Sequence, residues 1–75
     1  MTLDSLKPGR SAMITAVSGD DALRFRLLDL GLTPGTMITV YSLAPAGDPI
    51  VVLVRGYQLS LRRSDARRIG VRQDR

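Results

Sequence analysis

The sequence predicts a mainly β protein, a small barrel of about five short strands with one short helix after the first strand. Three observations support this prediction. The chain has 75 residues, the length of one small domain, and we treat residues 1–75 as a single domain. Several short segments alternate apolar and polar residues, which is the period of a half-buried strand. One segment near the start has helical spacing instead, and turn-forming residues bound it.

The first strand and the helix are expected in the first half of the chain. Residues 11–19, SAMITAVSG, alternate as a strand. Residues 18–31, SGDDALRFRLLDLG, are typical of a short helix with Ser18 as its N-cap. Gly31 is placed to end the helix in a left-handed turn. Three residues share one side of this helix and should pack on the barrel: Leu23, Leu27 and Leu30.

The second half of the chain is predicted to supply the other strands and one more turn of helix. Strands are expected at 36–44, 50–54, 57–61 and 71–73, because these segments are rich in β-branched or alternating residues. Arg55-Gly56 is the expected tight turn between two of them, and Ser64 is the expected cap of the extra helical turn. Short strands joined in this way favour an SH3-like or OB-like barrel.

The stretch 54–63, VRGYQLSLRR, opens like an RNA-recognition strand, with Arg, Gly and an aromatic residue. Such a strand needs further rings at alternate positions, because each stacked base needs its own ring. The places after Tyr57 hold Leu59 and Leu61, and the chain has only two Tyr, one Phe and no Trp. We therefore predict that these three residues form a core-facing row. Two arginines follow the row and should lie at a solvated strand end: Arg62 and Arg63.

The charge is basic, but it is a weak guide to function. The net charge is +4 and the pI is about 10.7. Ten of the eleven basic residues are Arg and all seven acidic residues are Asp, a one-sided usage that a GC-rich genome explains as readily as a functional need. Net charge concerns solubility and loose association. We expect no specific nucleic-acid partner.

The composition argues against an enzyme and against a metal site. The chain has no Cys and no His, so the commonest general base and the usual transition-metal ligands are absent. No Gly-rich phosphate loop followed by Lys-Ser/Thr is present. Asp20 and Asp21 are adjacent but suit a helix start better than a catalytic pair. We predict no catalytic residues, no metal ligands and no cofactor.

No segment has the pattern of a membrane span or a signal peptide. The longest apolar run is 50–54, IVVLV, which is far too short to cross a bilayer. Residues 1–10 lack a basic start followed by an apolar core. We expect a cytoplasmic protein without direct membrane insertion.

Two surfaces are candidates for binding a partner. Phe25 and Leu28 fall opposite the leucine side of the helix. Either another part of the chain covers them, or they form with Arg24 an exposed patch that docks on a partner. Val51 and Leu53 form the second candidate, because they face away from their buried neighbours if that strand is half-buried.

Several short motifs together carry a resemblance to a known family. They are Arg26-Leu27, Leu30-Gly31-Leu32, Pro34-Gly35, Gly47-Asp48-Pro49, Arg55-Gly56, Leu59 and Leu61-Arg62. In this order and spacing, from about Leu3 to Val71, the chain closely resembles FeoA, the small cytosolic protein of the bacterial ferrous-iron uptake system. One departure is Asp65, where such sequences more often carry Glu.

The resemblance implies an SH3-like β-barrel that works beside FeoB, a membrane ferrous-iron transporter with a cytosolic GTP-binding domain. A similar domain ends some iron-dependent repressors, but this chain starts at Met1 and shows no DNA-binding helices. The favoured hypothesis is an accessory protein that binds or regulates the transporter.

Two alternatives stay open. One is a GTPase-activating or regulatory partner that lends Arg55, in its tight turn, to the transporter's GTP-binding domain. The other is a basic nucleic-acid-binding module, whose affinity should fall steeply with salt. Weak self-association also remains open.

Overall fold

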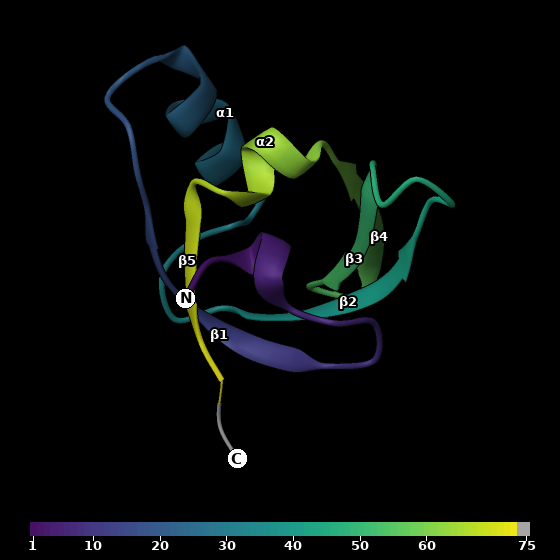
Figure 1. The fold of residues 1–75 in the computed structure, drawn as a ribbon. Helices are drawn as coiled ribbons and strands as arrows, with labels where there is room; N and C mark the ends of the chain where they lie inside the picture. Colours follow the sequence, from purple (N-terminus) through teal and green to yellow (C-terminus); the bar gives the residue numbers. More distant parts are fainter. Residues whose placement is uncertain (74–75) are drawn as a thin grey trace.

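The computed structural model describes residues 1–73 and contains, over that range, five strands, two α-helices and one 3₁₀ turn (Figure 1). The strands are β1 (Ser11–Val17), β2 (Met37–Leu43), β3 (Ile50–Val54), β4 (Tyr57–Leu61) and β5 (Ile69–Arg72). The helices are α1 (Ala22–Asp29) and α2 (Arg63–Ala66), and the 3₁₀ turn is η1 (Leu3–Ser5). Every predicted element is present, with ends that differ by a few residues.

The strands form one curved antiparallel sheet in the order β4-β3-β2-β1-β5. The first and last strands of this order do not pair, so the sheet is not closed, as fits an SH3-like fold. In Figure 1, α2 bridges the opening between β4 and β5, and α1 lies beside it. The mainly β, SH3-like prediction is confirmed.

The predicted alternation holds in β3 and in β2 as far as Val40, and it fails in part of β1. Ile38 and Val40 of β2 are fully buried opposite buried residues of β3. In β1, Ala12 and Ile14 are buried, but Ala16 is exposed and Val17 is buried instead. The register of β1 against β5 shifts between Ile14 and Ala16, and this bulge moves the inward position by one residue.

The β3–β4 hairpin closes through a two-residue turn, as predicted. Val54 pairs with Tyr57 across it. Both turn residues have positive φ, 50° at Arg55 and 85° at Gly56. Positive φ at both positions is the mark of a type I′ turn, whose twist matches that of the flanking strands.

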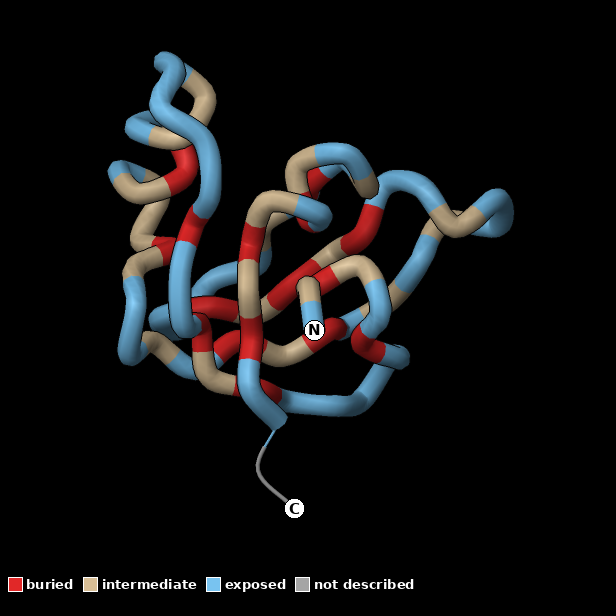
Figure 2. Tube along the Cα trace, turned by 60° about the vertical axis from the view of Figure 1, so that its left-hand side comes forward, coloured by how far each residue is buried: buried red, intermediate tan, exposed pale blue. Residues whose placement is uncertain are grey.

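The core lies inside the curve of the sheet (Figure 2). Its largest fully buried side chains come from η1, β1, α1, the loop after α1, β2, β3 and β5: Leu3, Ile14, Leu27, Leu32, Ile38, Val40, Ile50, Val52, Val54 and Ile69. No buried polar or charged residue is found among residues 1–73. Hydrophobic burial therefore holds the elements together, as expected of a small barrel.

The predicted core-facing row in β4 is only partly correct. Leu61 is buried and Leu59 is half-buried, but Tyr57 is 42% exposed. Tyr57 begins an edge strand, so no further strand covers it. Its hydroxyl donates a hydrogen bond to the carbonyl of Leu30. The ring therefore joins the hairpin to the end of α1 instead of entering the core.

Candidate interaction surface around helix α1

The start of α1 is fixed by Asp21. Its carboxylate accepts a hydrogen bond from the Arg24 backbone N–H at 3.4 Å, so Asp21 is the N-cap and the prediction of Ser18 was wrong. Arg68 donates two hydrogen bonds to the same carboxylate, at 2.7 and 3.1 Å. These bonds from Arg68 are the main cause that lowers the pKa of Asp21. The helix start is thereby tied to the turn before β5.

The end of α1 is fixed by Gly31, as predicted. Gly31 has φ of 97°, its N–H donates to the Leu28 carbonyl, and the Leu32 N–H donates to the Leu27 carbonyl. These two bonds define a Schellman motif, which normally brings an apolar pair into contact. Leu27 and Leu32 are both buried, so this end of the helix is anchored in the core.

Phe25 lies on the outward side of α1 and is 58% exposed. The guanidinium carbon of Arg24 lies 5.8 Å from the centre of its ring, a cation–π distance. The Nε of Arg24 donates to the Val17 carbonyl at 2.9 Å, which holds the arginine side chain against the end of β1. Arg24 and Phe25 thus form one ordered outward pair.

Leu28 and Phe25 were predicted to be either covered together or exposed together, but only Phe25 is exposed. Leu28 is half-buried and packs against the core cluster. The reason is its place in the last turn of α1, where the Schellman motif draws the chain into the core through Leu32. The exposed patch on this helix consists of Phe25 and Arg24, with Leu28 at its inner margin.

Val51 and Leu53 face away from the core, as predicted, and both are half-buried. Their neighbours on the outer face of the sheet include two large exposed side chains that sequence reasoning did not select, Met37 at 47% and Tyr41 at 56% exposure. Alternation with the buried Ile38 and Val40 was the signal that could have found them. This outer sheet face is a second apolar surface.

Arg55 is exposed, but its side chain is held in place. It donates from Nη2 to the hydroxyls of Thr33 and Thr36, at 3.0 and 2.9 Å, and from Nε to the Gly31 carbonyl at 3.3 Å. The guanidinium therefore links the β3–β4 turn to the loop after α1. An arginine that reaches into a partner would have to break these bonds.

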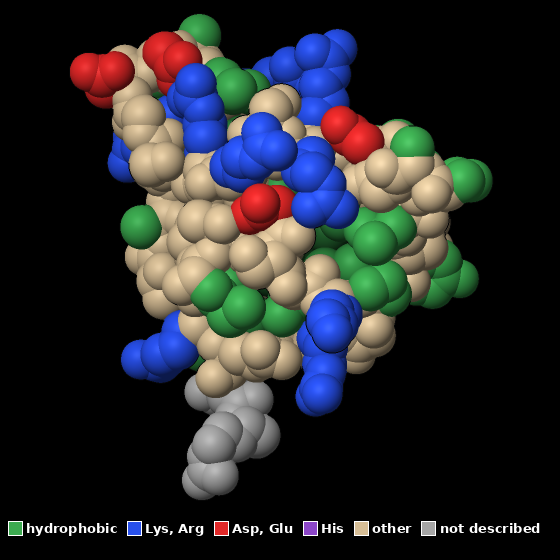
Figure 3. Space-filling model, in the orientation of Figure 1, with side chains coloured by type: hydrophobic (Ala, Val, Ile, Leu, Met, Phe, Trp, Pro, Cys, Tyr) green, Lys and Arg blue, Asp and Glu red, His purple; other side chains and the backbone are tan. Residues whose placement is uncertain are grey.

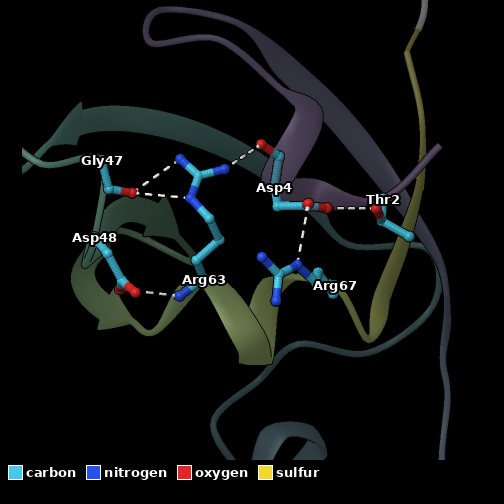
Figure 4. Close-up of polar contacts among 6 residues, drawn as sticks. All are labelled: Thr2, Asp4, Gly47, Asp48, Arg63 and Arg67. Carbon is cyan, nitrogen blue, oxygen red and sulfur yellow. Dashed lines mark hydrogen bonds and ion pairs between the residues drawn. The ribbon is translucent and has the colours of Figure 1, made fainter.

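Arg63 was expected at a solvated strand end, and this prediction is wrong. Its Nε and Nη2 donate to the Gly47 carbonyl at 3.0 and 2.8 Å, and its Nη1 donates to the Asp4 carbonyl at 2.9 Å (Figure 4). Its backbone N–H donates to the Asp48 carboxylate at 3.1 Å. Arg63 thus joins α2, the β2–β3 loop and η1. Arg62 is exposed, as expected.

Basic side chains gather over α1 and α2, at the top of the view in Figure 3. A cleft of about 270 Å³ lies between α1, β4 and α2. Its lining residues are Leu23, Arg26, Ser60, Arg62 and Asp65. None of them was selected as a binding residue from the sequence, because they come from three segments that only the fold brings together.

Within residues 1–73, no group of three or more His, Cys, Asp or Glu side chains is placed to hold a metal ion. Over the same range, no helix is long and apolar enough to cross a membrane. Among the described residues, the candidate recognition features are the patch of Phe25 and Arg24, the outer sheet face and the charged cleft.

A family sequence model described as the FeoA domain matches residues 1–73. The chain belongs to the FeoA family. It is also 41% identical, over 71 residues, to an Fe(2+) transport protein A/Fe(2+) transporter FeoB fusion protein of Porphyromonas gingivalis. That match covers 95% of this chain but only 8% of the fusion protein. A relative thus carries this domain and FeoB in one polypeptide.

Solved FeoA structures share the fold. The FeoA protein of Chlorobium tepidum superposes with a TM-score of 0.90 at 44% identity, covering 97% of this chain and 70% of the other. The FeoA of Stenotrophomonas maltophilia, solved in complex with zinc and described as an SH3 domain protein, has a TM-score of 0.85 at 33% identity, covering 96% and 89%. A manganese-dependent transcriptional repressor also contains the fold, with a TM-score of 0.88 at 17% identity, and this chain spans 36% of its length.

Proposed function

We propose that this FeoA-family chain is a non-enzymatic accessory protein that binds a FeoB-type ferrous-iron transporter on its cytoplasmic side and regulates it. The observation that carries the proposal is the fusion of the two proteins in a relative that is 41% identical to this chain. Domains fused in one organism are held at high effective concentration. The fusion therefore supports a surface contact between the two proteins where they are separate chains.

The outward pair on α1, Phe25 with Arg24, is the surface that best suits such a contact. Phe25 is among the most exposed large hydrophobic side chains in the described range, and exposed aromatic anchors often carry much of an interface's energy. Burial of the exposed part of Phe25 against a partner would contribute about 1–2 kcal/mol of hydrophobic free energy to binding. The contact to Val17 keeps Arg24 ordered, so less conformational entropy is lost when a partner binds.

Regulation through docking fits this chain better than an inserted arginine. Arg55 makes three hydrogen bonds to the loop after α1, and a catalytic arginine would lose all three on entering a GTP site. We therefore propose that any effect on GTP hydrolysis acts through docking. Replacing Arg55 by Lys should leave the transporter's GTPase rate with this protein within about threefold of wild type, against the ~10³-fold loss expected for an arginine finger.

Binding to the purified transporter in detergent tests the proposal directly. Affinities are measured for the wild-type chain, for Phe25→Ser, and for Tyr41→Ser as a control, because Tyr41 is 56% exposed and Phe25 58%. We expect Phe25→Ser to weaken binding at least tenfold and Tyr41→Ser to change it less than twofold. The reverse pattern would move the contact to the outer sheet face, and no binding by the wild type would refute the proposed function.

A further inference from the structure

The cleft between α1, β4 and α2 is lined by polar and charged residues and by one apolar side chain, Leu23. Leu23 and Arg26 reach it from α1, Ser60 from β4, Arg62 from the residue after β4, and Asp65 from α2. At helical spacing Leu23 lies roughly opposite Phe25, so the cleft and the outward pair are on different sides of α1. The cleft is therefore a separate feature from the patch of Phe25 and Arg24.

The two arginines of the cleft have no side-chain partner among residues 1–73. No hydrogen bond or ion pair within that range engages the guanidinium of Arg26 or Arg62. By contrast, Arg24, Arg63 and Arg68 donate to carbonyls or a carboxylate of this chain. Asp65 lines the same cleft without bonding to either arginine. The cleft thus holds two free bidentate donors beside a single carboxylate.

The open edge of β4 runs into this cleft. β4 is the first strand of the sheet and pairs on one side only, with β3. Val54 and Tyr57 close a two-residue turn and therefore form a hydrogen-bonded pair. In an antiparallel ladder, hydrogen-bonded and non-hydrogen-bonded pairs alternate. The backbone N–H and C=O groups of Gln58 and Ser60 therefore point away from β3, toward the open edge. No other backbone hydrogen bond in the described range uses those groups. Ser60, one of these two residues, lines the cleft.

We propose that an extended segment of the partner protein, carrying an Asp or Glu, adds to the open edge of β4 and places its carboxylate between Arg26 and Arg62. The proposal rests on the proposed function, because it takes the transporter as the source of the segment. Main-chain hydrogen bonds to Gln58 and Ser60 hold the segment, which is the mode of β-strand addition. The two arginines select for the acidic side chain.

The chemistry of the cleft fits a peptide better than a free anion. An inorganic anion would use the guanidinium groups of Arg26 and Arg62 but not the strand edge or the apolar side chain of Leu23. An extended acidic segment uses all three, since its backbone pairs with the edge and a neighbouring apolar side chain covers Leu23. The net charge of +4 also favours the approach of an acidic segment.

The test compares the double variant Arg26→Gln/Arg62→Gln with the double variant Arg10→Gln/Arg72→Gln, in binding to the full transporter. Both variants lose two positive charges, and all four arginines are exposed. We expect the cleft variant to bind at least tenfold more weakly and the control to bind within threefold of wild type. Equal losses would reduce the effect to net charge and overturn the proposal.

A second measurement follows the strand edge itself. Hydrogen exchange of the Gln58 and Ser60 amides is measured in the free protein and in the complex. Both amides should exchange rapidly when free and at least tenfold more slowly when bound. Unchanged exchange in a complex that forms normally would refute strand addition and leave the proposed function standing, whereas failure of the wild type to bind would refute both.

Titration with inorganic phosphate alone separates a peptide site from an anion site. We expect no saturable shift of the Arg26 and Arg62 side-chain signals below about 10 mM phosphate. Saturation at micromolar phosphate, with the transporter still bound by the double cleft variant, would make the cleft an anion site and overturn the proposal.

Discussion

Arg68 and Asp21 form a two-bond ion pair, at 2.7 and 3.1 Å, that joins residues 47 positions apart in the chain. The same carboxylate caps α1 through the Arg24 N–H. The pair therefore connects the start of the helix that presents Phe25 to the turn that precedes β5. This contact makes the placement of α1 depend on an electrostatic link as well as on the buried Leu27.

The first prediction concerns pH. The pKa of Asp21 is lowered in the folded protein, so the carboxylate stabilises the fold at pH values above its unfolded pKa, about 3.9. That contribution is lost as the pH falls through the folded pKa. Asp21→Asn should therefore be less stable than wild type at pH 7, and the difference should shrink below about pH 4. Urea unfolding between pH 3 and 8 measures this difference in stability. Asp20→Asn is the control, because Asp20 is a neighbouring exposed residue, and it should show no comparable loss of stability at pH 7.

The second prediction ranks three positions of α1 by burial. Leu27→Ala should cost about 2–5 kcal/mol of unfolding free energy, because Leu27 is 1% exposed in the core. Phe25→Ser should stay within about 0.5 kcal/mol, as for a surface site. Leu28→Ser should fall between them, at about 1–2 kcal/mol, because Leu28 is half-buried. Denaturant unfolding of the three variants checks the order, and a Phe25 cost equal to that of Leu27 would show that the helix face is covered.

The third prediction concerns the arginine that joins α2 to two other segments. Arg63→Lys should cost about 1–3 kcal/mol, because an ammonium group cannot reproduce the planar pattern of donors that serves the carbonyls of Gly47 and Asp4. Arg62→Lys is the matched control and should change stability by less than about 0.5 kcal/mol. Thermal unfolding compares the two variants. Equal stability of both would show that the guanidinium bonds of Arg63 in Figure 4 add nothing to the fold.

The fold was predictable because its elements follow local patterns. The alternation around Ile38 and Val52 and the Arg55-Gly56 turn are decided within a few neighbouring residues. The errors at Arg63 and Tyr57 involve contacts between distant segments. Nothing near Arg63 in the sequence indicates that it will reach Asp4, 59 positions away. Nor does the sequence around Tyr57 show that its strand lies at an edge, since strand order depends on the whole topology.

The candidate site also contains one feature that follows from local sequence spacing and others that depend on the whole fold. Phe25 was predictable from helical spacing, because one short helix can bury only one side against a small sheet. The cleft was not, because Arg26, Ser60 and Asp65 meet only when the open edge of the sheet and two helices are placed together. The half-burial of Leu28 likewise depends on the Schellman turn and not on helical spacing alone.

The fourth prediction concerns iron. We expect no tight ferrous site in the isolated protein, because imidazole and thiolate ligands are absent and the carboxylates of residues 1–73 do not converge. Anaerobic calorimetry with ferrous iron should detect no stoichiometric binding at micromolar concentrations. The same titration with zinc is informative, since the Stenotrophomonas maltophilia FeoA was solved with zinc. Tight, one-to-one ferrous binding would contradict the prediction.

The last prediction concerns nucleic acid. Although the chain contains ten arginines, the guanidinium groups of Arg24, Arg55, Arg63 and Arg68 already donate to acceptors within the fold. Within residues 1–73 these four cations are engaged, and a cation that must leave an internal acceptor gains little from a phosphate. Each phosphate contact contributes about −0.9 to the slope of log affinity against log salt for duplex DNA.

We therefore expect weak, sequence-independent binding to duplex DNA, with a slope no steeper than about −3 and no detectable complex at physiological salt. Fluorescence anisotropy with two unrelated duplexes and one single-stranded RNA, measured from low to physiological salt, gives both quantities. The double variant Arg10→Gln/Arg72→Gln should flatten the slope, because these exposed arginines lie outside the internal bonds. A complex that survives physiological salt and prefers one sequence would instead favour a nucleic-acid-binding module, because net charge alone gives neither property.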